Sequence, residues 1–267
     1  MYTSYWDMQF NPFEKTLPIK KAFISADFTE AITRLDYLKK CKGIGLFTGA
    51  PGTGKSFVLR AFRDSLNSSL HKVIYLPLST ITNMEFFRGL ALEFGLQPAF
   101  RKIDLFREIQ SAIAVLALDR KITPVIILDE AQYLNSKILN DLKILMNFDF
   151  DSLNYAVLIL TGTSLLNSTL SLKNHEALAQ RIVINYLFQG LSSNDVRNYI
   201  NSQMQLCGAS PSVFPNETVE ALAHSCNGSI RKLNSLLIQC LIIGFNKKEK
   251  MISTDIVFSA NSDLSLS

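Results

Sequence analysis

One eight-residue stretch limits the possible folds of this chain more than any other feature of its sequence. It fits the pattern G-x-x-x-x-G-K-[ST] at every position. An apolar run at residues 45–48 precedes it, and residues 57–62 after it carry apolar side chains at helical spacing. This order predicts a phosphate-binding loop, because glycines let backbone N–H groups turn toward an anion and the helix N-terminus adds positive charge. The stretch consists of Gly49, Ala50, Pro51, Gly52, Thr53, Gly54, Lys55 and Ser56.

The loop predicts a nucleotide and a metal ion as cofactors. In a loop of this kind the lysine, here Lys55, reaches the β- and γ-phosphates, and the hydroxyl of Ser56 ligates Mg²⁺. Phe57 completes the stretch that we expect to contact the nucleotide. ATP and Mg²⁺ are therefore the expected cofactors.

A second motif ends in two carboxylates. The apolar run at residues 124–128 has the composition of a strand buried on both faces, and Asp129 and Glu130 follow it directly. The carboxyl ends of parallel strands are where such sheets bind ligands. We expect Asp129 to hold the Mg²⁺ shell and Glu130 to polarise the water that attacks the γ-phosphate. The alternative is a solvated acidic loop without a chemical role.

A further apolar run, at residues 155–160, ends in hydroxyl side chains. Thr161, Thr163 or Ser164 would there contact the γ-phosphate or the attacking water, and we take Thr163 as the catalytic candidate. The alternative is that these residues cap the following helix.

The hydrophobic pattern divides the chain into three parts. We expect an extended aromatic arm at residues 1–24, an α/β nucleotide-binding core with a parallel sheet at 25–188, and a small helical lid at 189–267. Asp27 is expected to cap the first long helix, and Ser192 with Asp195 forms a capping box. The predicted strands are 45–48, 72–76, 124–130 and 155–163, and the predicted helices are 27–40, 57–62, 83–94, 104–118, 134–148, 195–206, 217–225 and 229–245.

Composition and charge exclude several classes of protein. The four cysteines form no C-x-x-C pair, so neither a disulfide framework nor a zinc site is expected. The N-terminus does not resemble a signal peptide, and no apolar stretch is long enough to span a bilayer, so we expect a cytoplasmic protein with no membrane partner. The net charge is +4, and its whole excess of Lys and Arg lies before residue 189. This surplus permits binding to a nucleic acid without requiring it.

Together these motifs resemble those of AAA+ ATPases, and the resemblance implies a three-layer P-loop core with a helical lid. Residues 129–134, Asp-Glu-Ala-Gln-Tyr-Leu, are similar to the D-E-A-Q-x-L signature of the ExeA-like branch. Three further segments resemble that branch, as does the aromatic start with Asn-Pro-Phe at 11–13. These segments are Leu-Lys-Ile-Leu-Met-Asn-Phe at 142–148, Leu-Ala-Gln-Arg-Ile at 178–182 and Ser-Cys-Asn-Gly-Ser-Ile-Arg-Lys-Leu-Asn at 225–234.

The resemblance implies roles for two arginines. Arg181 would be the finger that reaches the γ-phosphate held by a neighbouring subunit, and Arg231 would sense the nucleotide in its own subunit. A guanidinium suits both roles because it binds phosphate bidentately. Two departures from the family pattern occur at residues 162–166 and at Ile230. Without the resemblance, surface or ion-paired arginines are the alternative interpretation.

The resemblance also implies a function. The chain is similar to short transposition ATPases such as TniB, TnsC, IstB and MuB, which assemble with ATP as ring or helical homo-oligomers on double-stranded DNA and recruit a transposase. We expect such a protein to hold DNA through phosphate contacts without sequence preference, with Arg101, Lys102 and Arg107 as the candidates. A solvated helix face is the alternative for these three residues. The competing function is a stand-alone ExeA-like ATPase that assists secretion-machinery or other protein-complex assembly without DNA.

Overall fold

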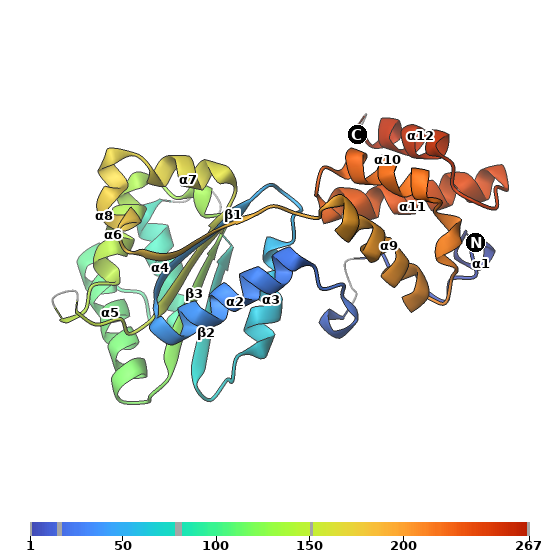
Figure 1. Cartoon of the computed structure of the whole chain (residues 1–267). Coiled ribbons are helices and arrows are strands. Elements are labelled where there is room, and N and C mark those ends of the chain that lie inside the picture. The colour runs from blue at the N-terminus through green and yellow to red at the C-terminus, as the bar shows by residue number, and fades with distance from the viewer. Residues whose placement is uncertain (1, 15–17, 78–81, 150–151, 266–267) are drawn as a thin grey trace. The chain divides into compact units, whose positions relative to one another are not determined.

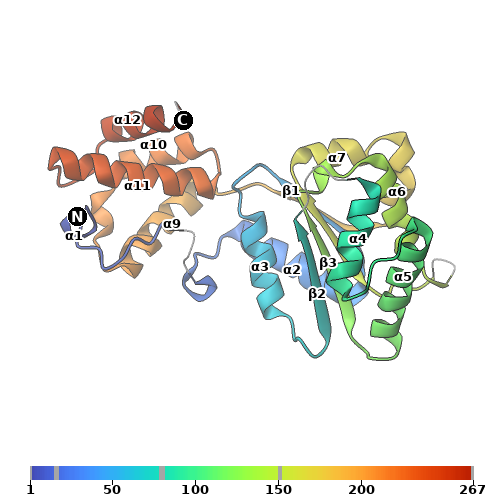
Figure 2. The same cartoon turned by 180° about the vertical axis from the view of Figure 1, so that it is seen from behind.

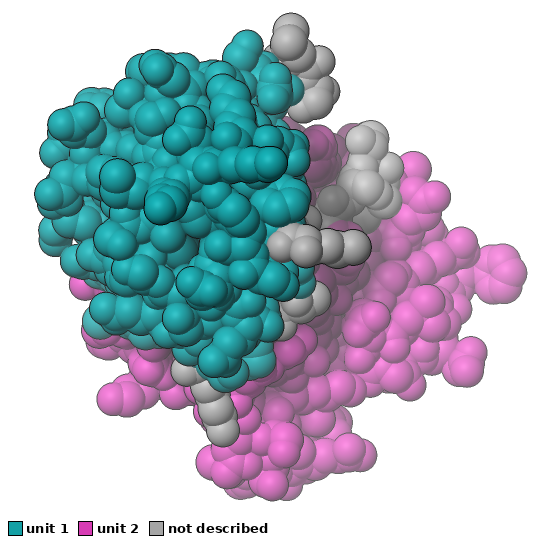
Figure 3. All heavy atoms as spheres, turned by 90° about the vertical axis from the view of Figure 1, so that its right-hand side faces the viewer, with its two compact units in different colours: residues 1–29, 50–54, 189–267 teal, residues 30–49, 55–188 magenta. Residues whose placement is uncertain are grey.

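The computed structural model describes residues 2–14, 18–77, 82–149 and 152–265, which form two compact units. The helical unit comprises Met1–Thr29, Ala50–Gly54 and Gln189–Ser267, and the α/β unit comprises Glu30–Gly49 and Lys55–Phe188. Figure 3 shows the two units in different colours. Each unit has a hydrophobic core of its own, and the two cores share no residue.

The α/β unit is built on a parallel sheet of five strands, in the spatial order β2-β3-β4-β1-β5 (Figure 1). The strand β4 therefore lies between β1, which leads into the glycine loop, and β3, which ends in Asp129. In the register of β1 and β4, Thr48 lies beside Gly162 at the carboxyl edge of the sheet. The strands are β1 (Gly43–Gly49), β2 (His71–Pro77), β3 (Thr123–Asp129), β4 (Val157–Gly162) and β5 (Ile182–Phe188).

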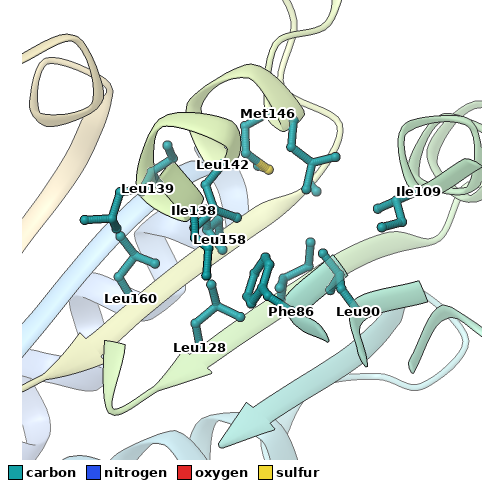
Figure 4. Packing of buried hydrophobic residues seen from close by; sticks show 14 of the residues in the cluster. Phe86, Leu90, Ile109, Leu128, Ile138, Leu139, Leu142, Met146, Leu158 and Leu160 are labelled. Carbon is teal, nitrogen blue, oxygen red and sulfur yellow. The ribbon is translucent and has the colours of Figure 1, made fainter. Parts of the chain in front are cut away.

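Helices cover both faces of this sheet, which makes three layers (Figures 1 and 2). On one face, alternate strand residues such as Leu128 and Leu158 pack against Phe86, Leu90 and helices further along the chain (Figure 4). On the opposite face α2 packs closely on β1. The helices are α2 (Ala26–Cys41), α3 (Lys55–Ser65), α4 (Asn83–Phe94), α5 (Lys102–Leu118), α6 (Ser136–Leu145), α7 (Ser164–Leu170) and α8 (Glu176–Ala179), with short 3₁₀ turns at Ala131–Tyr133 and Lys173–His175.

The helical unit packs four helices around a second core. Ser192 and Asp195 form the predicted capping box at the start of α9, where each side chain accepts the backbone N–H of the other. Gly208, with φ of +84°, follows the end of that helix. The helices are α9 (Ser193–Leu206), α10 (Asn216–Cys226), α11 (Ile230–Lys247) and α12 (Thr254–Ser265), with 3₁₀ turns at Ile19–Lys21 and Pro211–Val213.

The aromatic N-terminal residues belong to this helical unit. Trp6, Met8 and Phe13 are buried in its core, and the indole Nε1 of Trp6 donates a hydrogen bond to the carbonyl of Leu241 at 2.9 Å. We expected an extended arm, whereas residues 2–5 form a short helix, α1 (Tyr2–Tyr5). No residue of this short helix is buried, and the buried aromatic residues Trp6 and Phe13 follow it.

Further differences separate the expected elements from the observed ones, and helices α7 and α8 were not among the predicted helices. The strand β5 and the helix α12 were not predicted, and helix α6 begins at Ser136 rather than at Leu134, because the side chain of Asn135 caps it. At the start of α2, the hydroxyl of Ser25 accepts the N–H of Phe28 at 3.1 Å. The predicted cap, Asp27, lies inside that helix and accepts the N–H of Gly190 instead.

Two observations concern membrane-spanning helices and cysteine thiols in the described part of the chain. No helix within it has the length and apolar character needed to cross a membrane. All four cysteines carry free thiols, and three of them are buried. Burial raises the pKa of the Cys240 thiol to about 12.

Candidate functional site

The glycine loop, residues 49–56, connects β1 to α3. Gly52 and Gly54 have φ of +82° and +105°, conformations that side chains rarely adopt. Lys55 is buried, and its Nζ donates to the carbonyl of Gly49 at 2.8 Å. The amine is thus held at the carboxyl end of β1, where a phosphate group would sit beside the start of α3.

Within the helical unit, the start of α11 contacts the middle of this loop. The backbone N–H of Arg231 donates to the carbonyl of Gly52 at 3.3 Å, and the hydroxyl of Ser229 donates to the carbonyl of Pro51 at 3.3 Å. A Cβ on Gly52 would lie 2.4 Å from that hydroxyl oxygen, so only glycine fits there. The structure therefore brings the backbone of Arg231 beside Gly52, while its role as a nucleotide sensor stays a prediction.

Asp129 and Glu130 lie at the carboxyl end of β3. The carboxylate of Asp129 is buried, with Oδ2 accepting from the hydroxyl of Tyr75 at 2.8 Å and Oδ1 accepting from the N–H of Glu130 at 3.0 Å. Burial, the hydrogen bond to Asp129 and the negative charges of both carboxylates raise the pKa of Tyr75 to about 12. The hydroxyl of Tyr75 consequently remains a donor to Asp129 across the physiological range.

Glu130 has an exposed side chain and an unusual backbone conformation. Its φ of +56° lies in the left-handed region, which non-glycine residues seldom occupy outside functional or turn positions. Its Oε2 accepts a hydrogen bond from Nε2 of Gln132 at 2.7 Å. The amide oxygen of Gln132 in turn accepts from the backbone N–H of Thr163 at 3.1 Å.

This last contact places Thr163 beside the carboxylates. Thr163 follows β4 and occupies the N-cap position of α7, without a hydrogen bond from its side chain to the helix. Its neighbour Thr161 is fully buried in the sheet. The end of β4 thus lies between the glycine loop and Glu130, and Thr163 is the more accessible of the two threonines.

The described residues fit a metal ion that arrives with a nucleotide. They contain no cluster of three or more His, Cys, Asp or Glu side chains that would hold a metal ion by itself. Magnesium is commonly bound through one or two carboxylates together with substrate phosphates and water. The buried carboxylate of Asp129 and the exposed hydroxyl of Ser56 provide that kind of partial ligand set.

Arg181 lies at the opposite edge of the sheet from the glycine loop. It directly precedes β5, whose first residue, Ile182, pairs with Ile44 at the amino end of β1. A strand of this length spans about 20 Å, so Arg181 is far from the phosphate loop of its own chain. Its Nη1 donates to the carbonyl of Lys143 near the end of α6. The structure therefore does not bring Arg181 together with Lys55 or Glu130.

The three DNA-binding candidates surround the start of α5. Arg101 is the N-cap residue of that helix, and Arg107 lies on its exposed face. Lys102, by contrast, forms a salt bridge of 2.5 Å with Asp141, and its ammonium lies 5.7 Å from the centre of the Phe87 ring. Lys102 is thus occupied within its own unit, which weakens it as a phosphate contact.

Sequence reasoning overlooked two residues that contact the carboxylates. Gln132 stands within the quoted D-E-A-Q segment, and Tyr75 lies on β2, but neither received a role. Local patterns could not reveal Tyr75, because its contact with Asp129 depends on the pairing of β2 with β3. The strand β5 was detectable in principle, since residues 182–188 are mostly β-branched, aromatic or otherwise apolar.

Comparison with known proteins finds sequences that are similar to parts or all of this chain. Residues 38–170 match the family described as AAA domain. The chain is 28% identical to general secretion pathway protein A of Aeromonas hydrophila, in an alignment that covers 97% of this chain and 48% of that protein. The chain therefore spans about half the length of the curated relative it matches.

Several solved structures share the fold. Cdc6p from Pyrobaculum aerophilum superposes with a TM-score of 0.68 at 14% identity, covering 94% of this chain and 70% of that one. The Aeropyrum pernix ORC1 protein in complex with DNA gives 0.64 at 18% identity, covering 97% and 69%. The Drosophila ORC bound to DNA gives 0.67 at 16% identity, covering 96% and 65%. The chain thus has the expected P-loop AAA+ fold with a five-stranded parallel sheet.

Proposed function

We propose that this chain binds ATP with Mg²⁺ at residues 49–57, hydrolyses it, and assembles with copies of itself when ATP is bound. The observation that carries the proposal is the arrangement of the carboxyl edge of the sheet. Lys55 lies just after β1, Asp129 and Glu130 end β3, and β4 alone separates these strands. Neighbouring strands are about 5 Å apart, so the ends of β1 and β3 are about 10 Å apart, and a bound triphosphate beside Lys55 would extend toward the carboxylates.

Each residue has a distinct task in this proposal. Lys55 neutralises the β- and γ-phosphates, and Ser56 and Asp129 hold the magnesium shell. Glu130 accepts a proton from the attacking water, and Thr163 contacts the γ-phosphate or that water. Bound Mg²⁺ supplies positive charge that offsets the charge developing on the phosphates.

Arg181 is assigned to the neighbouring subunit's site. Its distance from its own loop agrees with a role across a subunit interface, where a guanidinium offsets charge on the transferred phosphoryl group. The hydrogen bond to the carbonyl of Lys143 fixes the arginine to α6 before assembly. Arg231, beside the loop of its own chain, would respond to the nucleotide in its own subunit.

For the partner, we propose double-stranded DNA, held without sequence preference, and a role in target selection and transposase recruitment during transposition. Arg101 and Arg107 support this proposal, because both are exposed and neither takes part in an ion pair within the described residues. Phe100 beside them is 91% exposed. Two such arginines per subunit bind weakly alone, but their phosphate contacts add when subunits line up along one duplex.

A second candidate function is an ATPase that assists assembly of a secretion machine without DNA. The 28% identity to general secretion pathway protein A favours it, because that relative matches nearly the whole of this chain. The two candidates share the ATP site and self-assembly and differ only in the partner. An assay for DNA binding therefore separates them.

The ATP site is tested with two substitutions. Lys55→Ala should abolish ATP binding, because the amine is the cation held at the end of β1. Glu130→Gln should bind ATP normally and hydrolyse it about 100-fold or more slowly. Both are measured with a fluorescent nucleotide and by phosphate release. Normal turnover by Glu130→Gln would exclude Glu130 as the base.

The partner is tested by the anisotropy of labelled duplexes across salt concentrations, with ATP, with ADP and without nucleotide. Binding should require ATP, and the slope of log affinity against log salt should shrink by about 2 for each bound subunit in Arg101→Ala/Arg107→Ala. Arg120→Ala, an exposed arginine beyond the other end of α5, is the matched control and should leave the slope unchanged. Absence of DNA binding in every nucleotide state would favour the protein-assembly function.

A further inference from the structure

The side-chain amide of Gln132 joins the ends of two neighbouring strands. Its Nε2 donates to Oε2 of Glu130 at 2.7 Å, and its Oε1 accepts from the backbone N–H of Thr163 at 3.1 Å. Only the amide oxygen can accept from an N–H group, and only the NH₂ group can donate to a carboxylate. The two partners therefore determine which way the amide points.

Gly162 provides the space for this amide. A Cβ on Gly162 would lie 2.2 Å from Oε1 of Gln132, a distance that real side chains do not adopt. The backbone of Gly162 does not itself require glycine, because its φ is not in the left-handed region. Glycine at the end of β4 thus serves to admit the Gln132 amide, and in β1 the neighbour of Gly162 is Thr48, the residue before the glycine loop.

The Glu130 carboxylate needs such a contact. Its side chain is exposed and its backbone is in the left-handed region, so packing does not hold it in one direction. A freely rotating glutamate loses side-chain entropy when it must point at one water molecule. Within the part of the chain that the structure describes, Gln132 is the residue that donates a hydrogen bond to this carboxylate.

From these contacts we propose that Gln132 is a positioning residue, which orients the Glu130 carboxylate toward the water that attacks ATP and ties its direction to the end of β4. The inference rests on the proposed ATP hydrolysis and deepens it. Because the same amide accepts the N–H of Thr163, a shift of the β4 end moves Gln132 and, with it, Glu130. Contact of the γ-phosphate with Thr163 would in this way set the direction of the carboxylate.

The first test separates catalysis from binding. In Gln132→Ala, kcat should fall about 10- to 100-fold, while KM and ATP affinity stay within about threefold. This is the usual loss when a residue that only orients another functional group is removed. Gln132→Glu keeps an acceptor for the Thr163 N–H but replaces the donor by a carboxylate that repels Glu130, so its kcat should fall at least as far. Tyr133→Ala, an exposed neighbour in the same turn, is the control and should retain kcat.

The second test removes the contact from the β4 side. Gly162→Ala should displace the amide and lower kcat as Gln132→Ala does, although no polar group is changed. Adding Gln132→Ala to Gly162→Ala should then lower kcat by less than about twofold, because both substitutions break the same contact. Fully additive losses, or normal kcat in Gln132→Ala, would overturn the proposal.

A third measurement does not depend on hydrolysis. Hydrogen exchange of the Thr163 amide should be slow in the wild-type protein and in Gln132→Glu, and fast in Gln132→Ala, because only alanine removes the acceptor. Fast exchange in the wild type would show that the amide does not join the strand ends. If exchange behaves as expected but the wild type does not hydrolyse ATP, the proposed function fails and the structural contact stands.

Discussion

At the scale of single residues, Asp129 depends on a neighbour from another strand. Its buried carboxylate receives the hydroxyl of Tyr75 from β2, in addition to a backbone N–H group. A group that hydrogen-bonds to a metal ligand without contacting the metal orients that ligand. Loss of such a group commonly lowers metal affinity about 10-fold or more. For the proposed magnesium site at Asp129, Tyr75 is therefore expected to influence the magnesium concentration that hydrolysis needs, although it need not contact the ion.

Tyr75→Phe removes only this hydroxyl. We expect the Mg²⁺ concentration for half-maximal ATP hydrolysis to rise about 10-fold, with the maximal rate at saturating Mg²⁺ largely retained. Hydrolysis is measured across a magnesium titration. Tyr37→Phe serves as the control, since that tyrosine lies exposed on α2. An unchanged titration curve in Tyr75→Phe would show that Asp129 is oriented by the backbone alone.

At the scale of elements, two glycines in the α/β unit differ in the space around them: a side chain fits at one position and not at the other. A Cβ on Gly45 in β1 would lie 2.4 Å from Leu38 Cδ2 of α2, so the helix and the strand pack too closely for a side chain. A Cβ on Gly89 in α4 would lie 3.5 Å from Leu76, which is an ordinary contact. Glycine inside a helix lowers stability relative to alanine.

The two alanine substitutions should consequently change the free energy of unfolding in opposite directions. Gly45→Ala should lower the free energy of unfolding by about 1 to 3 kcal/mol through overpacking. Gly89→Ala should raise it by about 0.5 to 1 kcal/mol. Both values are read from urea unfolding followed by circular dichroism. A stable Gly45→Ala protein would mean that α2 can move away from β1 at little cost.

The contact between α9 and α11 predicts a dependence on alkaline pH. The hydroxyl of Tyr199 donates to Oδ1 of Asn234 at 2.6 Å, and burial raises the pKa of Tyr199 to about 12 from its ordinary value of 10.0. The unfolded chain loses this proton near pH 10 while the folded chain retains it. The associated stability is therefore fully present below pH 10 and is lost as the pH rises through about 12.

This contribution amounts to about 2 to 3 kcal/mol for a shift of that size. Tyr199→Phe has no titrating hydroxyl, so its unfolding free energy should decline less steeply than that of the wild type between pH 10 and 12. The measurement is chemical unfolding at a series of pH values, monitored by tryptophan fluorescence. Equal slopes in the two proteins would show that Tyr199 does not resist ionisation in the fold.

At the scale of the whole molecule, the two units have separate cores, and the single tryptophan, Trp6, lies in the helical one. Its fluorescence reports unfolding of the helical unit, whereas circular dichroism reports both units. Chains with separate cores need not unfold in one transition. We expect the two signals to give different urea midpoints.

A matched pair of substitutions tests this expectation. Leu237 in α11 and Leu90 in α4 are both fully buried, one in each core. Leu237→Ala should lower the stability seen by fluorescence by about 2 to 5 kcal/mol, and Leu90→Ala should leave the fluorescence midpoint nearly unchanged while shifting the circular dichroism. Equal shifts of both signals in both variants would show that the units unfold together.

Much of the fold was predictable from local patterns. The glycine loop, the apolar run before Asp129 and the capping box at Ser192 each encode a structure within a few residues, because backbone conformation and side-chain periodicity act locally. Helix α4 was predicted with its observed bounds, 83–94. The expected three-layer parallel sheet is confirmed, because strands alternating with helices leave few other arrangements.

The tertiary structure alone decided the features that join distant segments. The order β2-β3-β4-β1-β5 brings Tyr75 to Asp129 and Gln132 to Thr163, and no local pattern records which strands become neighbours. The position of β5 at the edge of the sheet also follows from strand order alone, and the ion pair of Lys102 with Asp141 joins side chains 39 residues apart. Sequence by itself thus determined that the glycine loop joins a strand to a helix and that the two carboxylates follow a buried strand. Long-range packing determined which side chains orient them, because contacts across the sheet depend on strand order and register rather than on neighbouring residues.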